Sequence, residues 1–425
     1  MRCLPFLNGA AKTEHTTTKS ATVRSFSTTS TDRETRSGSD LNNLNASDMS
    51  TESIRRTQYP SFTDHPSNLR LFTFSELKNA TRNFSRSLMV GEGGFGCVYR
   101  GVIKNSDEPT ERIEIAVKQL NRKGGQKEWL TEMNVLGIVD HPNLVKLIGY
   151  CADDDERGMQ RLLVYEYMPN GSVDDHLASR SNSTLSWPMR LKVALDAARG
   201  LKYLHEEMDF QVIFRDLKTS NILLDENWNA KLSDFGLARH GPQEGLSHVS
   251  TAVVGTLGYA APEYMQTGRL TAKSDIWGYG VLLYELITGR RPIDRNRPKG
   301  EQKLLDWVKP YISDVKRFPI IVDPRLEGHY NLKSMTKLAG VANRCLLRIP
   351  KSRPKMSEVY EMVLKIVDSV ESGPPQPPLH YHGSVSEPGA KRTKKGSLKR
   401  RFHEFKFGSR LIVWRGWKPE VIKTC

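Results

Sequence analysis

Two acids, a lysine and an amide stand at short, fixed spacings in the stretch VIFRDLKTSNILLDENWNAKLSDFG, residues 212–236. Asp216 lies on a predicted loop between two short apolar strand candidates, where its carboxylate could accept the proton of an attacking hydroxyl. Lys218, two residues later, could neutralise a phosphoryl group during transfer. These residue types at this spacing indicate phosphoryl transfer to a hydroxyl group.

Oxygen ligands for a metal ion follow in the same stretch. Asn221 and Asp234 supply hard oxygen atoms that suit Mg²⁺ (or Mn²⁺), held partly by the protein and partly by nucleotide phosphates. Gly236 is expected to let the chain turn directly after Asp234. An isolated Asp or Asn is more often a turn or capping residue. Five residues in register favour the chemical interpretation.

A glycine-rich segment, GEGGFGCV at residues 91–98, has the spacing GxGxxGxV. The spacing alone fits a dinucleotide-binding turn equally well. Such a turn would open a helix, whereas the alternating, β-branched residues 97–103 (CVYRGVI) predict a strand. The segment is therefore predicted to be a β-hairpin lid, whose glycines let backbone N–H groups approach phosphate closely.

Lys118 lies among apolar neighbours in the predicted strand Ile113 to Leu120. Such a lysine either snorkels at a strand edge or binds phosphate, and in the second case it needs a carboxylate partner. The predicted helix Gln126 to Val139 offers Glu132 beside its apolar face and Glu128 on its solvated face. We predict that Glu132 is the partner.

The set Arg-Asp-x-Lys-x-x-Asn followed by Asp-Phe-Gly resembles the catalytic and metal loops of protein kinases. Longer segments narrow the resemblance to the plant receptor-like cytoplasmic kinases, which act on Ser and Thr: FTFSELKNATRNFS, LVYEYMPNGSVDDHL, FRDLKTSNILLD and HVSTAVVGTLGYAAPEY. The resemblance covers about residues 71–370. Phe214 stands where histidine is common, and we expect it to pack against Phe235.

This resemblance implies an α/β (α+β) fold, the bilobal protein kinase fold, over residues 84–370. A small β-rich N-lobe is expected at about residues 84–168 and a larger helical C-lobe at about 169–370. Residues 1–70 are rich in Ser and Thr, and residues 371–425 are Pro-rich and then basic, so both are expected to be disordered tails.

Three helix signals lie outside these motifs. A capping box at residues 73–76 predicts a short helix packed on the N-lobe, and residues 187–205 show apolar positions at helical intervals. Ser274 is predicted to cap a buried helix over residues 275–287. Asp275, in the first turn of that helix, is expected to bind the backbone of the catalytic loop.

Functional residues of the family carry over onto matching positions. The resemblance implies catalytic roles for Asp216, Lys218 and Asn221, and metal binding by Asn221 and Asp234. Tyr165 would guard the back of the adenine pocket. The implied ATP-binding residues, of which the last two act through their backbone, are Val90, Gly91, Glu92, Gly93, Gly94, Phe95, Gly96, Cys97, Val98, Lys118, Glu132, Glu166 and Met168.

Residues 234–263 have the length and landmarks of an activation segment that ends in Ala-Pro-Glu. Its part at residues 255–259 would form the substrate platform, where Thr256 and Lys218 favour Ser and Thr acceptors. Arg353 matches the arginine that pairs with the last glutamate of the segment, Glu263, in the family. The ordinary alternative is that Arg353 is simply an exposed arginine. The expected regulatory phosphosites are Ser250, Thr251 and Thr256.

The net charge of +15 is concentrated at one end of the chain. Residues 391–425 contain 12 Lys and Arg against 2 Asp and Glu, whereas residues 71–390 carry only +3. The nearly neutral body argues against nucleic-acid binding, so no specific nucleic acid is expected as a partner. The basic run 391–401 fits a solvated linker, a nuclear-import signal or an anionic-lipid patch. Trp414 and Trp417 favour the membrane slightly.

Cys3, beside an apolar Leu-Pro-Phe-Leu run, is a candidate for S-acylation with palmitate. There is no run of 18 apolar residues, and the first residues have too short an apolar core for a secretory signal. Scattered cysteines without CxxC spacing predict neither a disulfide framework nor a zinc site. We expect the cytoplasmic face of the plasma membrane, with the nucleus as the alternative.

The predicted function is ATP-dependent transfer of the γ-phosphoryl group to Ser and Thr hydroxyls of protein substrates. The resemblance implies upstream receptor kinases as partners in immune signalling (plant defence) or growth signalling, and a monomer is expected. The alternative is a pseudokinase-like scaffold that docks on receptors. Loss of any catalytic or metal-binding residue would favour the scaffold, and all of these residues are present.

Overall fold

The computed structural model describes residues 69–94, 96–105, 110–121, 125–155, 158–178 and 184–372. Cys3, Phe95 and the basic run 391–401, predicted as a lipid anchor, a nucleotide contact and a targeting signal, lie outside the described residues. Within the described ranges, no helix combines the length and apolar character needed to cross a membrane.

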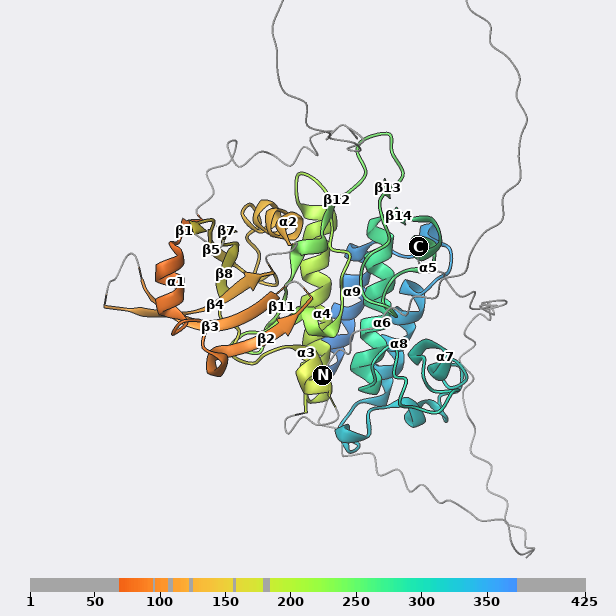
Figure 1. Cartoon of the computed structure of the whole chain (residues 1–425). Coiled ribbons are helices and arrows are strands. Elements are labelled where there is room, and N and C mark those ends of the chain that lie inside the picture. Colours follow the sequence, from red (N-terminus) through yellow and green to blue (C-terminus); the bar gives the residue numbers. More distant parts are fainter. Residues whose placement is uncertain are drawn as a thin grey trace, which may run out of the picture. The chain divides into compact units, whose positions relative to one another are not determined.

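The N-lobe is built on a mixed sheet. Its strands are β1 (Arg70–Leu71), β2 (Met89–Gly93), β3 (Gly96–Lys104), β4 (Arg112–Leu120), β5 (Leu147–Cys151) and β8 (Leu162–Glu166), in the order β1-β5-β8-β4-β3-β2. Strand β1 runs parallel to β5, and the other neighbours are antiparallel. Figure 1 shows these strands in orange and yellow, with helix α2 (Gln126–Leu136) beside them. A small hairpin, β6 (Asp154–Asp155) and β7 (Gly158–Met159), lies between β5 and β8 in the sequence.

A short helix lies between β1 and β2 in the sequence, which confirms the helix predicted from the capping box. Helix α1 spans Phe74–Ala80, and the side chains of Thr73 and Glu76 each bond the other residue's backbone N–H. Leu77 and Phe72 are buried in a cluster with side chains of β4, β5 and β8. This cluster is separate from the main core, so α1 covers one face of the sheet while α2 packs in the main core.

The glycine-rich segment is an antiparallel hairpin of β2 and β3, as predicted, with Gly93 opposite Gly96. A Cβ added to Gly93 or Gly94 would meet no atom within 4 Å, which leaves the backbone of these residues accessible. Gly96 has a different task. Its φ is +145°, and a Cβ there would collide with the carbonyl oxygen of Gln119 on β4. Gly96 therefore permits strand packing rather than phosphate approach.

Helix α2 ends three residues earlier than the sequence predicts. It was expected to reach Val139, but it ends at Leu136, where Gly137 forms the C-cap and donates its N–H to the carbonyl of Met133 at 2.9 Å. Gly137 has φ −71° and ψ −13°, a right-handed backbone that any residue can adopt, so its conformation does not require glycine. Apolar spacing alone did not reveal this end.

The C-lobe is mainly helical. Its helices are α3 (Val173–Leu177), α4 (Trp187–Lys202), α5 (Pro262–Thr267), α6 (Ala272–Thr288), α7 (Leu304–Val308), α8 (Leu332–Cys345) and α9 (Met356–Glu371). Short strands between them are β9 (Val212–Ile213), β10 (Ile222–Leu224), β11 (Ala230–Leu232), β12 (Arg239–His240), β13 (Val249–Ser250) and β14 (Arg269–Leu270). The turn η1 (Arg86–Leu88) belongs to the N-lobe, and the single turns of the C-lobe are η2 (Tyr203–Glu207), η3 (Thr219–Asn221), η4 (Phe235–Leu237), η5 (Phe318–Ile321), η6 (Pro324–Leu326) and η7 (Pro350–Ser352). The β-rich N-lobe and helical C-lobe confirm the predicted fold class.

Helix α6 is buried nearly all round, as predicted, but its start was predicted wrongly. The N-cap is Thr271, not Ser274, because the Thr271 side chain accepts the N–H of Lys273 at 3.2 Å. Ser274 is the third helical residue and bonds back to the Thr271 N–H at 3.3 Å. The two residues form a capping box with serine in the place of the usual acid.

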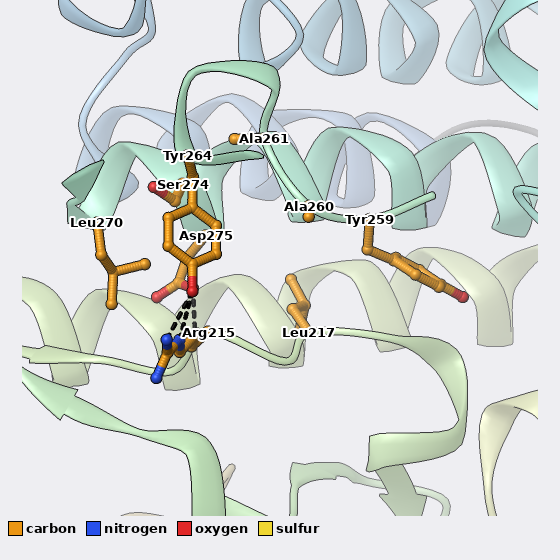
Figure 2. A pocket seen from close by; sticks show the side chains of 10 residues that line it. Arg215, Leu217, Tyr259, Ala260, Ala261, Tyr264, Leu270, Ser274 and Asp275 are labelled. Atoms are coloured by element: carbon orange, nitrogen blue, oxygen red, sulfur yellow. Dashed lines mark hydrogen bonds between the residues drawn. The ribbon is translucent and has the colours of Figure 1, made fainter. Parts of the chain in front are cut away.

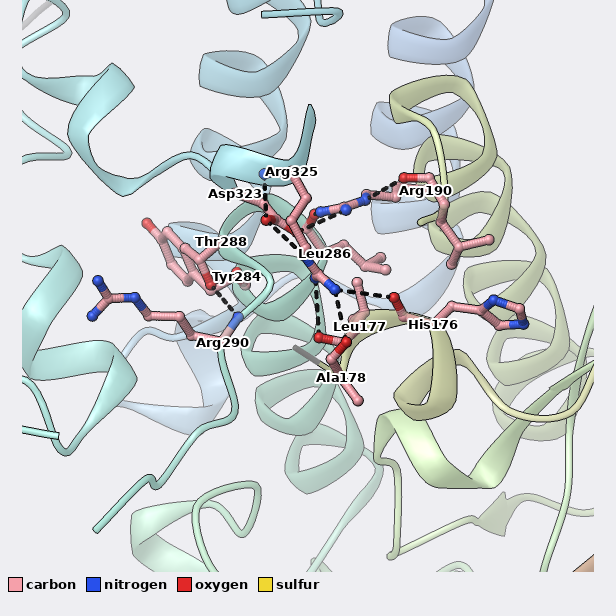
Figure 3. Close-up of polar contacts among 11 residues, drawn as sticks. His176, Leu177, Ala178, Arg190, Tyr284, Leu286, Thr288, Arg290, Asp323 and Arg325 are labelled. Carbon is pink, nitrogen blue, oxygen red and sulfur yellow. Dashed lines mark hydrogen bonds and ion pairs between the residues drawn. The ribbon is translucent and has the colours of Figure 1, made fainter. Parts of the chain in front are cut away.

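A buried ionic cluster joins three helical segments of the C-lobe (Figure 3). Arg190 of α4, fully buried, donates to Asp323 at 2.8 Å and to the carbonyl of Leu286 on α6 at 2.9 Å. Arg325 pairs with the same Asp323 at 2.7 Å and donates to the carbonyls at the end of α3. Because every charge here has a partner, the cluster fixes the relative positions of these helices.

Candidate active site

The loop that carries Asp216 is held by helix α6. Asp275 accepts hydrogen bonds from the backbone N–H groups of Phe214 at 2.8 Å and of Arg215 at 2.7 Å. The predicted contact between Asp275 and the catalytic loop is therefore confirmed. The same carboxylate bonds Nε2 of His205 at 2.8 Å, a contact the sequence did not indicate. This grip maintains Arg215 at a φ of 74°, in the strained left-handed region.

Three side chains converge on the buried carboxylate of Asp216. Lys218 Nζ lies 2.6 Å and Asn221 Nδ2 3.1 Å from its Oδ2 atom. Thr256 donates to its Oδ1 atom at 2.6 Å, and Lys218 Nζ is 3.3 Å from the Thr256 hydroxyl. The carboxylate is thus fixed in orientation, beside a cation and beneath the predicted substrate platform.

Thr256 was predicted both as a platform residue and as a phosphosite. Its hydroxyl is engaged by Asp216 and Lys218. A phosphate on this oxygen would carry about −1.5 to −2 charges directly beside the Asp216 carboxylate, which is unfavourable. The geometry therefore supports the platform role and argues against phosphorylation of Thr256 in the folded site.

Asn221 and Asp234, the predicted metal ligands, lie at the ends of η3 and η4. Asn221 donates its amide N–H groups to the carbonyl and the carboxylate of Asp216, and its amide oxygen accepts no hydrogen bond from the described residues. Asp234 has φ 67° and ψ 71°, so it, and not Gly236, adopts the left-handed backbone. Gly236 lies in the turn η4 directly after Asp234, as expected, although the left-handed residue is Asp234. A Cβ at Gly236 would lie 3.1 Å from that of Glu128, so glycine makes room for α2.

Lys118 lies between two carboxylates that come from different elements. Its Nζ atom is 2.5 Å from Oε1 of Glu132 on α2 and 2.8 Å from Oδ1 of Asp234. Glu132 is thus the partner, as predicted. Burial opposes the Lys118 charge, but the two carboxylates raise its pKa overall. Burial raises the pKa of Glu132 to about 7, against the opposing effect of Lys118.

Tyr165 of β8 contacts the same glutamate from the opposite side. Its hydroxyl donates a hydrogen bond to Oε2 of Glu132, and burial raises the pKa of Tyr165 well above its ordinary value. The sequence predicted that Tyr165 guards the adenine pocket but did not predict this bond. Nearby, Phe214 and Phe235 pack edge to face with centroids 5.0 Å apart, which confirms the predicted contact.

Glu166 and Met168 continue from β8 into the connection between the lobes. The Glu166 N–H donates to the carbonyl of Lys146 at 3.1 Å, and its side chain pairs with Lys231 at 2.7 Å. The Met168 carbonyl accepts from the N–H of Gly171 at 3.2 Å. Within the described residues, the Met168 N–H has no hydrogen-bond partner, which leaves it available to a base.

The end of the activation segment is anchored by a bidentate ion pair. Arg353, fully buried, places Nη1 and Nη2 each 2.7 Å from the two carboxylate oxygens of Glu263. This confirms the predicted pair and excludes the exposed alternative for Arg353. Planar, two-point pairing of this kind is stronger than a single contact.

Arg215 and Tyr264 form a contact that the sequence did not predict (Figure 2). Arg215 donates to the Tyr264 hydroxyl from Nε at 2.9 Å and from Nη2 at 2.6 Å. Arg215 Nη2 also lies 3.1 Å from the hydroxyl of Thr251. The position of Tyr264 directly after Ala-Pro-Glu could have drawn attention to it, but nothing in the sequence connects it with Arg215.

The donor set fits a hard divalent cation that shares its ligands with a nucleotide. Asp234 contributes a carboxylate, and Asn221 an amide oxygen without a partner in the described chain. Among the described residues, no group of three or more His, Cys, Asp or Glu could hold a metal alone. Mg²⁺ retains several non-protein ligands, so this sparse oxygen set suits it better than an all-protein cage would.

The fold and site are those of a protein kinase. The structure has two lobes, Glu132 of a helix holds Lys118, and Lys218 and Asn221 fix the carboxylate of Asp216 on a loop. The family model described as protein tyrosine and serine/threonine kinase matches residues 84–363. Because the match covers well over half of the chain, the chain belongs to this family.

Curated relatives refine the assignment. Serine/threonine-protein kinase PCRK1 of Arabidopsis thaliana is 59% identical over 432 residues, which cover 100% of this chain and 100% of that protein. Serine/threonine-protein kinase PCRK2 of the same plant is 63% identical over 377 residues, 88% of this chain and 89% of that protein. Serine/threonine-protein kinase PBL34 is 56% identical over 69% of this chain and 60% of that protein. Within the family, the chain is a Ser/Thr kinase of the plant receptor-like cytoplasmic type.

Proposed function

We propose that Asp216 orients the acceptor hydroxyl of a protein substrate and takes its proton during transfer of the ATP γ-phosphoryl group. The convergence of Lys218, Asn221 and Thr256 on the Asp216 carboxylate carries this proposal. A fixed carboxylate accelerates transfer by positioning, because a correctly oriented acceptor needs little further ordering. Lys218, whose Nζ atom lies 2.6 Å from Asp216 Oδ2, would offset the charge of the phosphoryl group.

On the nucleotide side, we assign phosphate binding to Lys118, which Glu132 holds in place. Residues 90–98 would cover the phosphates, and the backbone of Glu166 and Met168 would bind adenine. Asn221 and Asp234 would hold Mg²⁺ or Mn²⁺, which supplies charge neutralisation on the phosphates when bound. Asp234, whose Oδ1 atom lies 2.8 Å from Lys118 Nζ, would contribute its carboxylate to this cation.

Substitution of Lys118 tests this nucleotide assignment. Lys118→Met should abolish autophosphorylation, while Lys118→Arg should retain nucleotide binding better because it keeps a cation between the two carboxylates. Radiolabelled ATP measures transfer, and the circular-dichroism melting curve verifies that each variant is folded. Transfer by folded Lys118→Met at the wild-type rate would refute the assignment. The pseudokinase alternative is not favoured, because every residue that transfer requires is in place.

We further propose that phosphate on Ser250 or Thr251 raises activity. The supporting observation is the contact of Arg215 Nη2 with the Thr251 hydroxyl, and Arg215 directly precedes the proposed base Asp216. Burial lowers the pKa of Arg215, so its charge is poorly solvated. A phosphate of about −1.5 to −2 charges would stabilise it and order the segment.

For the cellular role, we propose that this monomeric kinase relays signals from receptor kinases at the cell surface in immune or growth signalling. Membership of the receptor-like cytoplasmic kinases supports this proposal. Proximity labelling with the tagged full chain in its own cells tests it. The labelled set should contain receptor kinases, and it should change when their ligand is applied; a set without receptor kinases would contradict the relay.

The proposed address is the cytoplasmic face of the plasma membrane, through two weak anchors. One acyl chain on Cys3 gives only reversible binding, and each Lys or Arg near anionic lipid adds about 1 kcal/mol. The run 391–401 holds seven Lys and Arg. Imaging should show membrane signal that weakens in Cys3→Ser and is lost when these charges are also removed. If the run is instead a nuclear-import signal, its neutralisation empties the nucleus and leaves the membrane pool unchanged.

A further inference from the structure

The guanidinium of Arg215 is a buried cation that is surrounded by neutral acceptors. Its side chain donates to the hydroxyls of Tyr264 and Thr251 and to the carbonyl of Ala252. No carboxylate of the described chain pairs with this guanidinium, since the two oxygens of Asp275 are taken by backbone N–H groups and His205. Arg239 lies near enough to disfavour its charge further.

The hydroxyl of Tyr264 forms hydrogen bonds with Arg215 and with the backbone of residues 252–254. It donates to the carbonyl of Ala252 at 2.9 Å, and it accepts from the N–H of Val254 at 2.9 Å and from Arg215. A phenolic oxygen has one donor and two acceptor positions, so no capacity is left. Figure 2 shows the ring of Tyr264 reaching toward Arg215 with its hydroxyl foremost.

Side-chain packing does not hold the segment that Tyr264 binds. Val253 is 42% and Val254 38% exposed, and Leu257 further along is 62% exposed. Tyr264, by contrast, is 2% exposed and lies on α5, which the Glu263–Arg353 pair anchors. The hydrogen bonds of the Tyr264 hydroxyl to the backbone of Ala252 and Val254 therefore connect this weakly packed segment to the anchored helix α5.

We propose that Tyr264 is a positioning residue, whose hydroxyl links Arg215 to the backbone of residues 252–254 and so holds the substrate platform in place when the activation segment carries no phosphate. The platform begins directly after this tie. Gly255 has φ 125°, and a Cβ there would lie 3.4 Å from the carbonyl oxygen of Arg215 and 3.9 Å from Oδ1 of Asp216. A shift at residues 252–254 consequently moves Thr256, which donates to Asp216.

A phosphate on Thr251 would reach the same guanidinium that Tyr264 binds. The Tyr264 hydroxyl is a neutral and permanent partner of Arg215, whereas a phosphate on Thr251 would be a charged and removable partner. Tyr264 therefore matters most in the unphosphorylated enzyme. This last consequence rests on the proposed phosphate regulation, while the positioning role rests on the contacts alone.

Tyr264→Phe removes only the hydroxyl and leaves the buried ring in place. Tyr284→Phe is the matched control, because Tyr284 is equally buried and its hydroxyl bonds Asn343 at 2.7 Å between α6 and α8. Both are made in the full chain and treated with phosphatase. Steady-state kinetics give kcat and the KM values for peptide and ATP, and hydrogen exchange reports on residues 250–258.

For Tyr264→Phe we expect kcat/KM for the peptide to fall about tenfold, because the Val254 N–H and the Arg215 donors lose their acceptor. The KM for ATP should stay within about twofold, and exchange at residues 250–258 should accelerate. The control should match the wild type in all three. Unchanged peptide kinetics in Tyr264→Phe would overturn the proposal, as would an equal loss in Tyr284→Phe or an equal change in the KM for ATP, since these indicate a general folding effect.

A comparison of the phosphorylated and dephosphorylated enzymes distinguishes the positioning role of Tyr264 from the proposed regulation by phosphate. Enzyme phosphorylated on Thr251 should lose less from Tyr264→Phe than dephosphorylated enzyme. If phosphate regulation fails but positioning is correct, the wild-type rate is independent of phosphate and Tyr264→Phe is slow in both states. A wild-type chain without any transfer would instead contradict the proposed function itself.

Discussion

At the scale of single residues, Glu132 is a fully buried carboxylate with partners on both oxygens. Lys118 binds one oxygen at 2.5 Å and the Tyr165 hydroxyl binds the other. The tyrosine therefore fixes the glutamate that fixes the lysine. Since the sequence identifies only the lysine and the glutamate, the third member of this chain of contacts emerges from the structure alone.

Tyr165→Phe should weaken nucleotide binding without unfolding the protein. Loss of a hydrogen bond to a buried carboxylate costs about 1–3 kcal/mol, and part of this cost appears as disorder of Lys118. We expect the KM for ATP to rise about tenfold while the peptide KM is unchanged. Nucleotide titration on the purified variant measures this, with Tyr284→Phe as the control. An ATP KM equal to that of the wild type would show that the hydroxyl does not support Lys118.

Glu285 of α6 gives the clearest pH dependence at this scale. It is 2% exposed, its Oε2 has no partner in the described chain, and burial raises its pKa well above 4.5. The unfolded state releases this proton above pH 4.5 and the folded state does not, so the stability from this group is full below that pH and is lost as pH rises.

Glu285→Gln should remove this pH-dependent loss of folding stability, because glutamine does not titrate. The free energy of unfolding of the variant, minus that of the wild type, should grow as pH rises above about 4.5, by at most about 1.4 kcal/mol per pH unit. Urea denaturation at several pH values measures the difference. A difference that does not change with pH would contradict the raised pKa.

At the scale of elements, helix α1 closes a face of the N-lobe sheet that would otherwise be exposed. Leu77 is fully buried in the cluster with Phe72 and residues of β4, whereas Lys78 on the same helix is exposed. Leu77→Ala should lower the free energy of unfolding by about 2–5 kcal/mol. Lys78→Ala should change it by no more than about 0.5 kcal/mol. Equal effects in chemical denaturation would show that α1 does not contribute to the N-lobe core.

The activation segment provides the second prediction for an element. Arg215 contacts Thr251, while Ser250 is exposed on β13. Of the two proposed sites, Thr251 contacts Arg215 directly, so Thr251→Ala should lose more of the rate increase that phosphorylation produces than Ser250→Ala does. Rates are compared before and after phosphatase treatment. An intact increase in Thr251→Ala would exclude Arg215 as the phosphate receiver.

At the scale of the whole molecule, residues that act through their chemistry were predictable, because each carries a distinct residue type at a fixed spacing. Lys118 pairs with Glu132 as the sequence indicated, and Asp216 and Asn221, which the sequence placed on one loop, contact each other. The two lobes followed from the same motifs. Residues that act through position were harder: the left-handed backbone of Asp234 has no signature in its side chain.

Contacts between distant segments account for most of what the sequence did not reveal. Arg190 and Asp323 are 133 positions apart, and Arg215 and Tyr264 are 49 apart. No local periodicity or motif connects such pairs, since they meet only after the helices have packed. The predicted N-cap of α6 was also wrong. Thr271 and Ser274 are both residue types that cap helices, and only the backbone conformation shows that Thr271 is the N-cap.

Asp216, the proposed base, is held in place by the side chains of Lys218, Asn221 and Thr256. Asp216→Asn is the most direct test, because it keeps the size and the hydrogen-bond acceptor for Thr256 but removes the charge. Asp225→Asn is the matched control, since Asp225 is a turn residue that only binds neighbouring backbone and side-chain groups.

The measurement is single-turnover transfer of radiolabelled phosphate to a Ser- or Thr-containing peptide, with nucleotide affinity determined on the same proteins. We expect Asp216→Asn to slow transfer by about 100- to 10,000-fold at unchanged nucleotide affinity, and Asp225→Asn to transfer phosphate at the wild-type rate. Transfer by folded Asp216→Asn at close to the wild-type rate would show that Asp216 is not the base.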